Sequence, residues 1–182
     1  MNIKILPVGR LQANCYILEK DNKVLIIDPG DEFEVIDSSI NGDVVGVLIT
    51  HNHFDHVGAL KEIINKYNPV LYYSNINDEV HYDKLIDLNE ETYKIGDFIF
   101  DAIYFPGHRN DLYAFYFKED NIMFDGDFVF ENGIGRVDLP HGSLSELKSS
   151  LEKLMKYDDS ITLYPGHGNK TNLGIEKEWI IG

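Results

Sequence analysis

Three histidines and an aspartate lie within one short segment, because residues 50–56 have the sequence THNHFDH. These side chains are His51, His53, Asp55 and His56, and the whole chain of 182 residues has seven histidines. Neutral imidazoles and a carboxylate packed this closely would leave their donor atoms poorly satisfied in an apolar core. A cation resolves that problem because all four side chains can ligate it. The segment therefore predicts a metal site.

Three later positions repeat one pattern, a candidate ligand at the end of an apolar strand with a glycine beside it. They are His108, Asp127 and His167, in the segments PGH, GD and PGHG. Glycine tolerates close backbone approach, and ligands at strand ends on one rim of a sandwich can converge. Four ligands in one short loop cannot easily encircle a single ion. We therefore expect the loop to divide its ligands between two adjacent ions, which the three distant residues complete.

The elements that must position these residues follow from the hydrophobic pattern. Apolar and β-branched runs predict strands near the N-terminus and at 15–18, 23–27, 44–49, 70–73, 92–105, 112–125 and 161–164, with turns inside the two longest. Helical spacing predicts one helix over 57–67 and another from Ser143, where Ser143 and Glu146 fit a capping box. The histidine loop thus joins a strand to a helix. The whole pattern predicts a mixed α/β (α+β) sandwich.

Size and charge limit the remaining possibilities. The length suits one domain, which we assign to residues 1–182. The net charge of −15 disfavours nucleic acid as a partner, because phosphate binding needs a concentrated basic face. No segment approaches the roughly 20 apolar residues that span a bilayer, and no leader-like run opens the chain. Cys15 is the single cysteine, which excludes an internal disulfide, and its place in an apolar strand predicts a buried packing role. We expect a cytoplasmic protein without membrane contact. The oligomeric state stays open.

The ligand pattern also carries a family resemblance. THNHFDH, followed by His108, Asp127 and His167, is similar to the metallo-β-lactamase superfamily. NCY at 14–16, IDPG at 27–30, GIGRVDLP at 133–140 and PGHG at 165–168 with Thr171 resemble its glyoxalase II-like (hydroxyacylglutathione hydrolase-like) branch. The resemblance covers nearly the whole chain. It implies an αββα sandwich with the metals at one edge between the two sheets.

Carried over position by position, the resemblance assigns the ligands to two divalent ions. One ion takes His51, His53 and His108, the second takes Asp55, His56 and His167, and Asp127 bridges both together with a water or hydroxide. Zinc is the expected metal, with iron or manganese as alternatives. Asp28 is expected to hydrogen-bond a ligating histidine while it also ends a strand in an Asp-Pro-Gly turn.

The implied activity is hydrolysis of small-molecule thioesters of small thiols. Zn²⁺ lowers the pKa of bound water to about 7, so a metal-bridging hydroxide can attack the carbonyl at neutral pH. A thiol has a pKa of about 8.5 and leaves as thiolate with little acid assistance. Asp55 is the expected catalytic residue, as a proton shuttle. The sequence continues for only a few residues after Thr171, so we expect a domain without the C-terminal helical region of glyoxalase II, and use of glutathione stays open.

Other functions stay open as well. His51, His108 and Asp127 could hold a single iron, as in persulfide dioxygenase-like oxidoreductases of the same superfamily. A hydrolase of another ester, such as a lactone or phosphodiester, and a non-catalytic metal-binding module are further alternatives. The segment GHRND at 107–111 departs from the relatives' usual pattern, and Arg109 is either a contact for an anionic substrate or a surface arginine. Arg136 and Asp138 are expected to form a structural pair.

Overall fold

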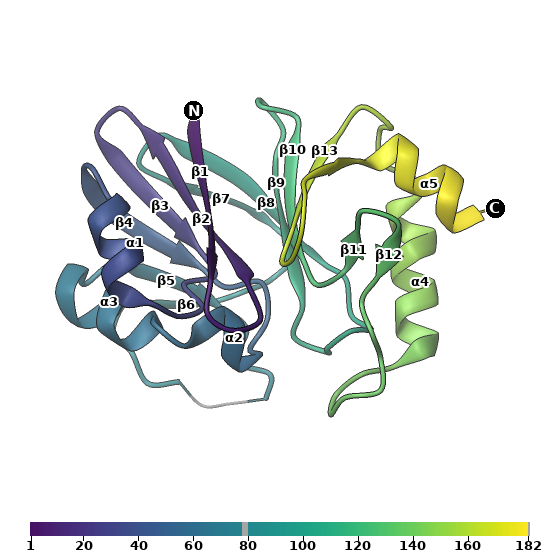
Figure 1. Cartoon of the computed structure of the whole chain (residues 1–182), viewed down its shortest axis with the longest axis horizontal. Helices are drawn as coiled ribbons and strands as arrows, with labels where there is room; N and C mark the ends of the chain where they lie inside the picture. The colour runs from purple at the N-terminus through teal and green to yellow at the C-terminus, as the bar shows by residue number, and fades with distance from the viewer. Residues whose placement is uncertain (78–79, 182) are drawn as a thin grey trace.

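The computed structural model describes residues 1–77 and 80–181, in which two mixed β-sheets pack face to face and helices cover both outer faces (Figure 1). The first sheet has six strands, and their order across the sheet is their order in the chain. They are β1 (Asn2–Val8), β2 (Ala13–Lys20), β3 (Lys23–Ile27), β4 (Asp43–Leu48), β5 (Val70–Tyr73) and β6 (Leu85–Asp87). Strands β1 to β3 are antiparallel, and each later strand is parallel to its neighbour.

The second sheet is also six-stranded, and its strands follow their order in the chain from β7 to β14, except that β11 and β12 lie outside it. Its order is β14 (Thr171–Asn172), β13 (Thr162–Pro165), β10 (Ile122–Gly126), β9 (Tyr113–Phe117), β8 (Phe98–Tyr104) and β7 (Thr92–Ile95). Only β10 and β13 pair in parallel, so their carboxyl ends reach the same edge of the sheet. A separate two-stranded hairpin, β11 (Val129–Phe130) with β12 (Gly133–Ile134), follows β10.

Alternation along the strands divides the side chains between two layers of core. In β2, Tyr16 and Leu18 enter the layer between the sheets, whereas Cys15 and Ile17 pack toward the outer helices. Cys15 is fully buried there, which confirms its predicted packing role, and burial raises the pKa of its thiol. Large aromatic side chains dominate the layer between the sheets. They are Tyr16, Tyr72, Tyr93, Phe98, Phe100, Tyr113, Phe115, Phe117, Phe124 and Tyr164.

Four helices cover the outer faces. Ile36 of α1 (Phe33–Ser39) and Ile63 of α3 (Leu60–Tyr67) pack on the first sheet. Leu147 of α4 (Leu144–Leu154) and Leu173 of α5 (Leu173–Ile181) pack on the second. This arrangement confirms the predicted αββα sandwich. Within the described part of the chain, no helix is long and apolar enough to cross a membrane.

The predicted helix over 57–67 is wrong in one respect, because the structure divides this region into α2 (Phe54–Val57) and α3. The backbone N–H of Ala59 donates to the carbonyl of Pro29 at 3.0 Å instead of continuing α2. The tertiary contact therefore replaces a helical hydrogen bond. Helix α4 begins as predicted, since the hydroxyl of Ser143 accepts from the N–H of Glu146 at 3.3 Å. Helices α1 and α5 were not predicted.

Candidate metal centre

A hydrogen-bonded support on the first sheet positions the histidine loop. Strand β4 ends at Leu48, and the N–H of Thr50 donates to Asp28 Oδ1 at 2.8 Å. The hydroxyl of Thr50 donates to Asp28 Oδ2 at 2.6 Å, so its oxygen accepts from His51 Nδ1 at 3.0 Å. His56 Nδ1 donates to the same Asp28 Oδ2 at 2.9 Å. The expected hydrogen bond from Asp28 to a candidate ligand is thus present, and it fixes two fully buried imidazoles at once.

The second sheet brings three candidate ligands to the same edge. His108 lies in the loop between β8 and β9, Asp127 follows β10, and His167 follows β13. His108 Nδ1 donates to the carbonyl of Arg136 at 2.7 Å, and His167 Nδ1 donates to the carbonyl of Leu11 at 3.1 Å. Because a carbonyl can only accept, the neutral form of each ring turns an unprotonated Nε2 toward the centre.

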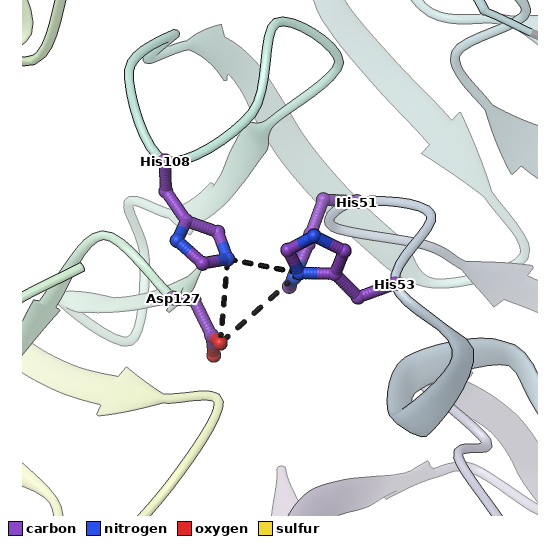
Figure 2. A group of neighbouring side chains, drawn as sticks. All are labelled: His51, His53, His108 and Asp127. Atoms are coloured by element: carbon purple, nitrogen blue, oxygen red, sulfur yellow. Dashed lines mark hydrogen bonds and ion pairs between the residues drawn. The ribbon is translucent and has the colours of Figure 1, made fainter. Parts of the chain in front are cut away.

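All seven predicted ligands come together in two adjoining groups of donor atoms. Cluster A consists of His51, His53, His108 and Asp127, and cluster B consists of Asp55, His56 and His167. Within each group the donor atoms lie within 4.8 Å of one another. Figure 2 shows cluster A, with His51 and His53 on one side and His108 and Asp127 facing them.

Distances within cluster A are short enough for one ion to reach every donor. His53 Nδ1 lies 3.1 Å from His51 Nε2 and 3.0 Å from His108 Nε2. Asp127 Oδ2 lies 3.6 Å from His108 Nε2 and 3.9 Å from His51 Nε2. Three imidazoles and a carboxylate are a donor set that suits zinc, iron or manganese.

Asp127 also faces cluster B. Its Oδ1 lies 3.4 Å from His56 Nε2, and its Oδ2 lies 3.5 Å from His167 Nε2. Asp55 Oδ2 lies 3.2 Å from His167 Nε2 and 3.6 Å from His56 Nε2. A carboxylate between two donor groups is the arrangement that the bridging role of Asp127 requires.

The buried polar atoms provide a test of whether cations fit. His56 Nε2 and Asp127 Oδ1 are buried, and neither has a hydrogen-bond partner within the part of the chain that the structure describes. The Nδ1 atoms of His51, His56, His108 and His167 are all used as donors, so their Nε2 lone pairs converge on the carboxylates. Lone pairs that face each other in a buried space repel unless a cation lies between them. Outer hydrogen bonds of this kind commonly orient metal-bound histidines. The residues therefore fit two adjoining metal ions.

The electrostatics of cluster A favour neutral imidazoles. Burial and the neighbouring His56 hold the pKa of His51 well below its ordinary value. Burial, together with His108 and Arg109, lowers the pKa of His53 to about 4. Burial also lowers the pKa of His108. Neutral imidazole is the form that ligates a metal.

Cluster B attracts positive charge. Burial would lower the pKa of His56, but Asp127 and Asp28 outweigh it and raise that pKa well above the ordinary value. Hydrogen bonds to Asp127 and Asp55 raise the pKa of His167 to about 9. Burial would raise the pKa of Asp127, but the facing histidines hold it well below its usual range. These carboxylates draw in positive charge, whether from protons or from a divalent cation.

Gly166 shows why a glycine stands beside a candidate ligand. A Cβ at this position would lie 2.1 Å from Asp127 Oδ1 and 2.7 Å from His56 Cε1. The backbone before His167 therefore passes directly against both clusters. The N–H of Gly166 donates to the carbonyl of Gly126 at 2.7 Å, which ties the ends of β13 and β10 together.

The surface interpretation of Arg109 is wrong. Its side chain is buried, and Nε and one terminal nitrogen donate to the two carboxylate oxygens of Asp111 at 2.9 and 3.0 Å. Asp111 Oδ2 also accepts from the N–H of Asn52, between two candidate ligands, at 3.3 Å. The sequence showed only an altered loop here, because nothing in the local pattern indicates that Arg109 is buried against Asp111. The expected pair of Arg136 with Asp138 is present, at 2.6 and 2.7 Å.

Comparisons with known proteins agree with this geometry. A family profile described as "Metallo-beta-lactamase superfamily" matches residues 8–167, which include all seven candidate ligands. Hydroxyacylglutathione hydrolase GloC of Haemophilus influenzae is 33% identical over 202 aligned positions, which cover 97% of this chain and 95% of that protein. The crystal structure of BLEG-1 B3 metallo-beta-lactamase aligns with a TM-score of 0.89 and 27% identity over 97% of both chains. The crystal structure of TTHA1623 in a di-iron-bound form aligns with a TM-score of 0.84 and 28% identity over 96% of both chains.

Proposed function

Because the chain belongs to the metallo-beta-lactamase superfamily of metal-dependent hydrolases, we propose that it cleaves thioesters of small thiols at clusters A and B. The observation that carries the proposal is the convergence of imidazole nitrogens on two carboxylates, where His56 Nε2 and Asp127 Oδ1 are buried without a hydrogen-bond partner among the described residues. We assign one ion to cluster A and a second to cluster B, with Asp127 shared between them.

Zinc is the metal that we propose, with iron or manganese as alternatives. The di-iron-bound form of the similar TTHA1623 supports keeping iron among them. Two such ions bound at these clusters would supply hydroxide at neutral pH and polarise a substrate carbonyl.

Asp55 is the residue that we propose moves protons. Its carboxylate belongs to cluster B, and its side chain keeps 13% exposure, whereas the His56 side chain beside it has none. Its carboxylate can take a proton from a nucleophilic water and release it to solvent. Contacts to His167 and His56 keep the pKa of Asp55 below its ordinary value although burial would raise it, so the carboxylate is ionised and ready to accept.

A thioester suits this set of residues better than an amide. A hollow of about 480 Å³ opens beside His108, Asp127 and His167. Among the described residues that line it, none is a lysine, tyrosine or cysteine that could protonate an amine leaving group. A thiolate leaves without such a donor because the pKa of a thiol is about 8.5. The similarity to a hydroxyacylglutathione hydrolase supports the same choice.

A small-molecule substrate also fits the charge of the chain. With 31 acidic and 16 basic residues, the surface repels a polyanion such as nucleic acid. We therefore propose neither nucleic acid nor a membrane as a partner.

Metal content and thioester cleavage test the proposal together. Protein purified without added metal should contain about two metal ions per chain and release thiol from a panel of small thioesters. His53→Ala removes one donor of cluster A and should lose the activity, whereas Asp120→Asn, on an exposed turn, should keep it. Rapid turnover by His53→Ala or by fully demetallated protein would overturn the proposal. One iron per chain with persulfide-dependent oxygen consumption would instead identify an oxidoreductase.

A further inference from the structure

The hollow beside the metal centre has an apolar wall. Besides the candidate ligands His108, Asp127 and His167, its lining includes Phe130 and Ile134. Both belong to the hairpin β11–β12, which lies near α5 in Figure 1. Ile134 is 38% exposed, and the Phe130 ring centroid lies 6.3 Å from that of His167. Apolar side chains left open beside a reactive centre are typical of ligand-binding hollows.

Buried contacts fix this hairpin in place. Glu176 of α5 is fully buried, and its Oε2 accepts from the N–H of Asn132, in the hairpin turn, at 2.9 Å. Its Oε1 accepts from the hydroxyl of Thr171 at 2.6 Å. After β12, a Cβ at Gly135 would lie 1.9 Å from the carbonyl oxygen of Asp127, so the returning strand presses against the metal centre. These contacts therefore hold the apolar wall in a fixed position.

The hollow presents little positive charge to an anionic substrate. Arg136 is its one charged side chain apart from the candidate ligands, and two of its nitrogens already donate to Asp138. Both residues are largely exposed, and the chain carries a net charge of −15. A second hollow borders Asp55 and also has apolar residues, Leu11 and Phe54, in its lining. It is smaller, about 280 Å³, and Arg10 and Asp31 add two charged side chains beside the candidate ligand, whereas Arg136 adds one to the first hollow. An apolar group would therefore favour the hollow beside Phe130 and Ile134.

We propose that this hollow binds an uncharged, apolar part of the substrate, so that the enzyme prefers apolar thioesters to charged glutathione thioesters. The inference rests on the proposed thioesterase function and specifies its substrate class. Burial of each added methylene against Phe130 and Ile134 should improve binding about fourfold until the hollow is full.

Binding of non-hydrolysable thioether analogues, measured by calorimetry on the full metal-loaded chain, tests the proposal. One series lengthens the acyl side and another lengthens the thiol side, each built on the uncharged thiol N-acetylcysteamine. A parallel pair with equal acyl groups compares N-acetylcysteamine with glutathione. We expect affinity to rise with length in one of the two series, and that series identifies which half of the substrate occupies the hollow. We also expect the glutathione analogue to bind more weakly than the N-acetylcysteamine analogue.

Matched variants locate the effect. Ile134→Ser should weaken binding of the longest analogue about tenfold and flatten the dependence on length. Ile175→Ser, at an equally apolar and 60% exposed position on α5, should leave both unchanged. Glu176→Ala should flatten the dependence by releasing the hairpin, and Glu176→Gln, which keeps an oxygen acceptor, should restore part of it. Thermal unfolding of each variant shows that the fold is retained.

The outcomes separate the two proposals. Affinity that is independent of length in both series, or tighter binding of the glutathione analogue, would overturn the apolar assignment even if thioesters are cleaved. Tight, length-dependent binding without cleavage of any thioester would overturn the thioesterase proposal, but it would support the assignment of the hollow as a site for apolar groups.

Discussion

The two walls of the metal centre are built in different ways. The first wall, His51, His53, Asp55 and His56, comes from six consecutive positions after β4. The second wall, His108, Asp127 and His167, takes one residue from each of three segments that are far apart in the chain. In the first wall, His51 and His56 are oriented by hydrogen bonds to the side chains of Thr50 and Asp28, close to one strand end. In the second wall, His108 and His167 donate to backbone carbonyls of distant segments.

This difference indicates where each wall is vulnerable. A local support can fail through a single residue, because Asp28 alone accepts three hydrogen bonds beneath the first wall. The second wall should lose metal binding when Asp127, which faces both clusters, is replaced, or when the elements that carry its residues move. Four substitutions, in order of decreasing expected effect, can test this distinction.

Asp127→Asn should have the largest effect because its carboxylate faces both clusters. We expect metal content to fall below one ion per chain and thioester turnover to fall about 1000-fold, the upper range for loss of one electrostatic stabiliser. Elemental analysis and a thiol-release assay measure both quantities. Asp97→Asn, on an exposed turn, is the control. Full metal content in Asp127→Asn would contradict a bridging role.

Asp111→Leu should remove the contacts that connect the loop of the first wall to the loop that carries His108. It leaves the buried Arg109 unpaired and removes the acceptor of the Asn52 N–H, so unfolding free energy should fall by about 3–5 kcal/mol. Chemical denaturation measures this change. The double variant Arg109→Leu/Asp111→Leu should recover part of the loss because no charge stays buried and unpaired. An unchanged denaturation midpoint in Asp111→Leu would show that the pair is dispensable.

Asp28→Asn tests the support of the first wall. The amide keeps one oxygen acceptor, but it cannot satisfy Thr50 and His56 as the carboxylate does. We expect metal affinity to fall about 10- to 100-fold, the usual range for a partner that orients a metal-bound histidine. Competition with a chelator measures the affinity. Lys23→Gln, which removes an exposed ion pair with Asp43, should leave it unchanged.

Ser143→Ala should have the smallest effect and act on the second wall. The residue caps α4, and its N–H donates to the carbonyl of Gly107, next to His108, at 2.7 Å. Loss of the cap should lower unfolding free energy by about 1 kcal/mol. Because the backbone hydrogen bond to Gly107 persists, metal content should stay constant. Thermal unfolding measures the change in stability, and elemental analysis measures the metal content. Loss of metal would show that the second wall depends on the cap itself.

Much of the fold could be predicted from residue patterns. β-Branched runs predicted the strands around Val24 and Val47, and the capping box predicted the start of α4. The patterns failed where tertiary contacts outweigh local preference. The Ala59 N–H donates to the Pro29 carbonyl and so divides one expected helix into α2 and α3. Helix α5 gave no helical pattern because its apolar residues are not segregated to one face, and Ile175, Trp179 and Ile181 stay exposed. The hairpin that presents Phe130 and Ile134 is too short to give a periodic signal.

The sequence by itself determined which side chains can ligate metal, because residue type and glycine spacing are local properties. It also determined the burial of Cys15, since an apolar strand leaves no other place for it. Only the tertiary structure decided which ring nitrogen His56, His108 and His167 turn inward, because Asp28, Arg136 and Leu11 supply the acceptors from distant segments. It alone decided that Arg109 is buried against Asp111 and that a hairpin forms an apolar wall beside the centre. Those features depend on how the two sheets meet, and no local pattern encodes that contact.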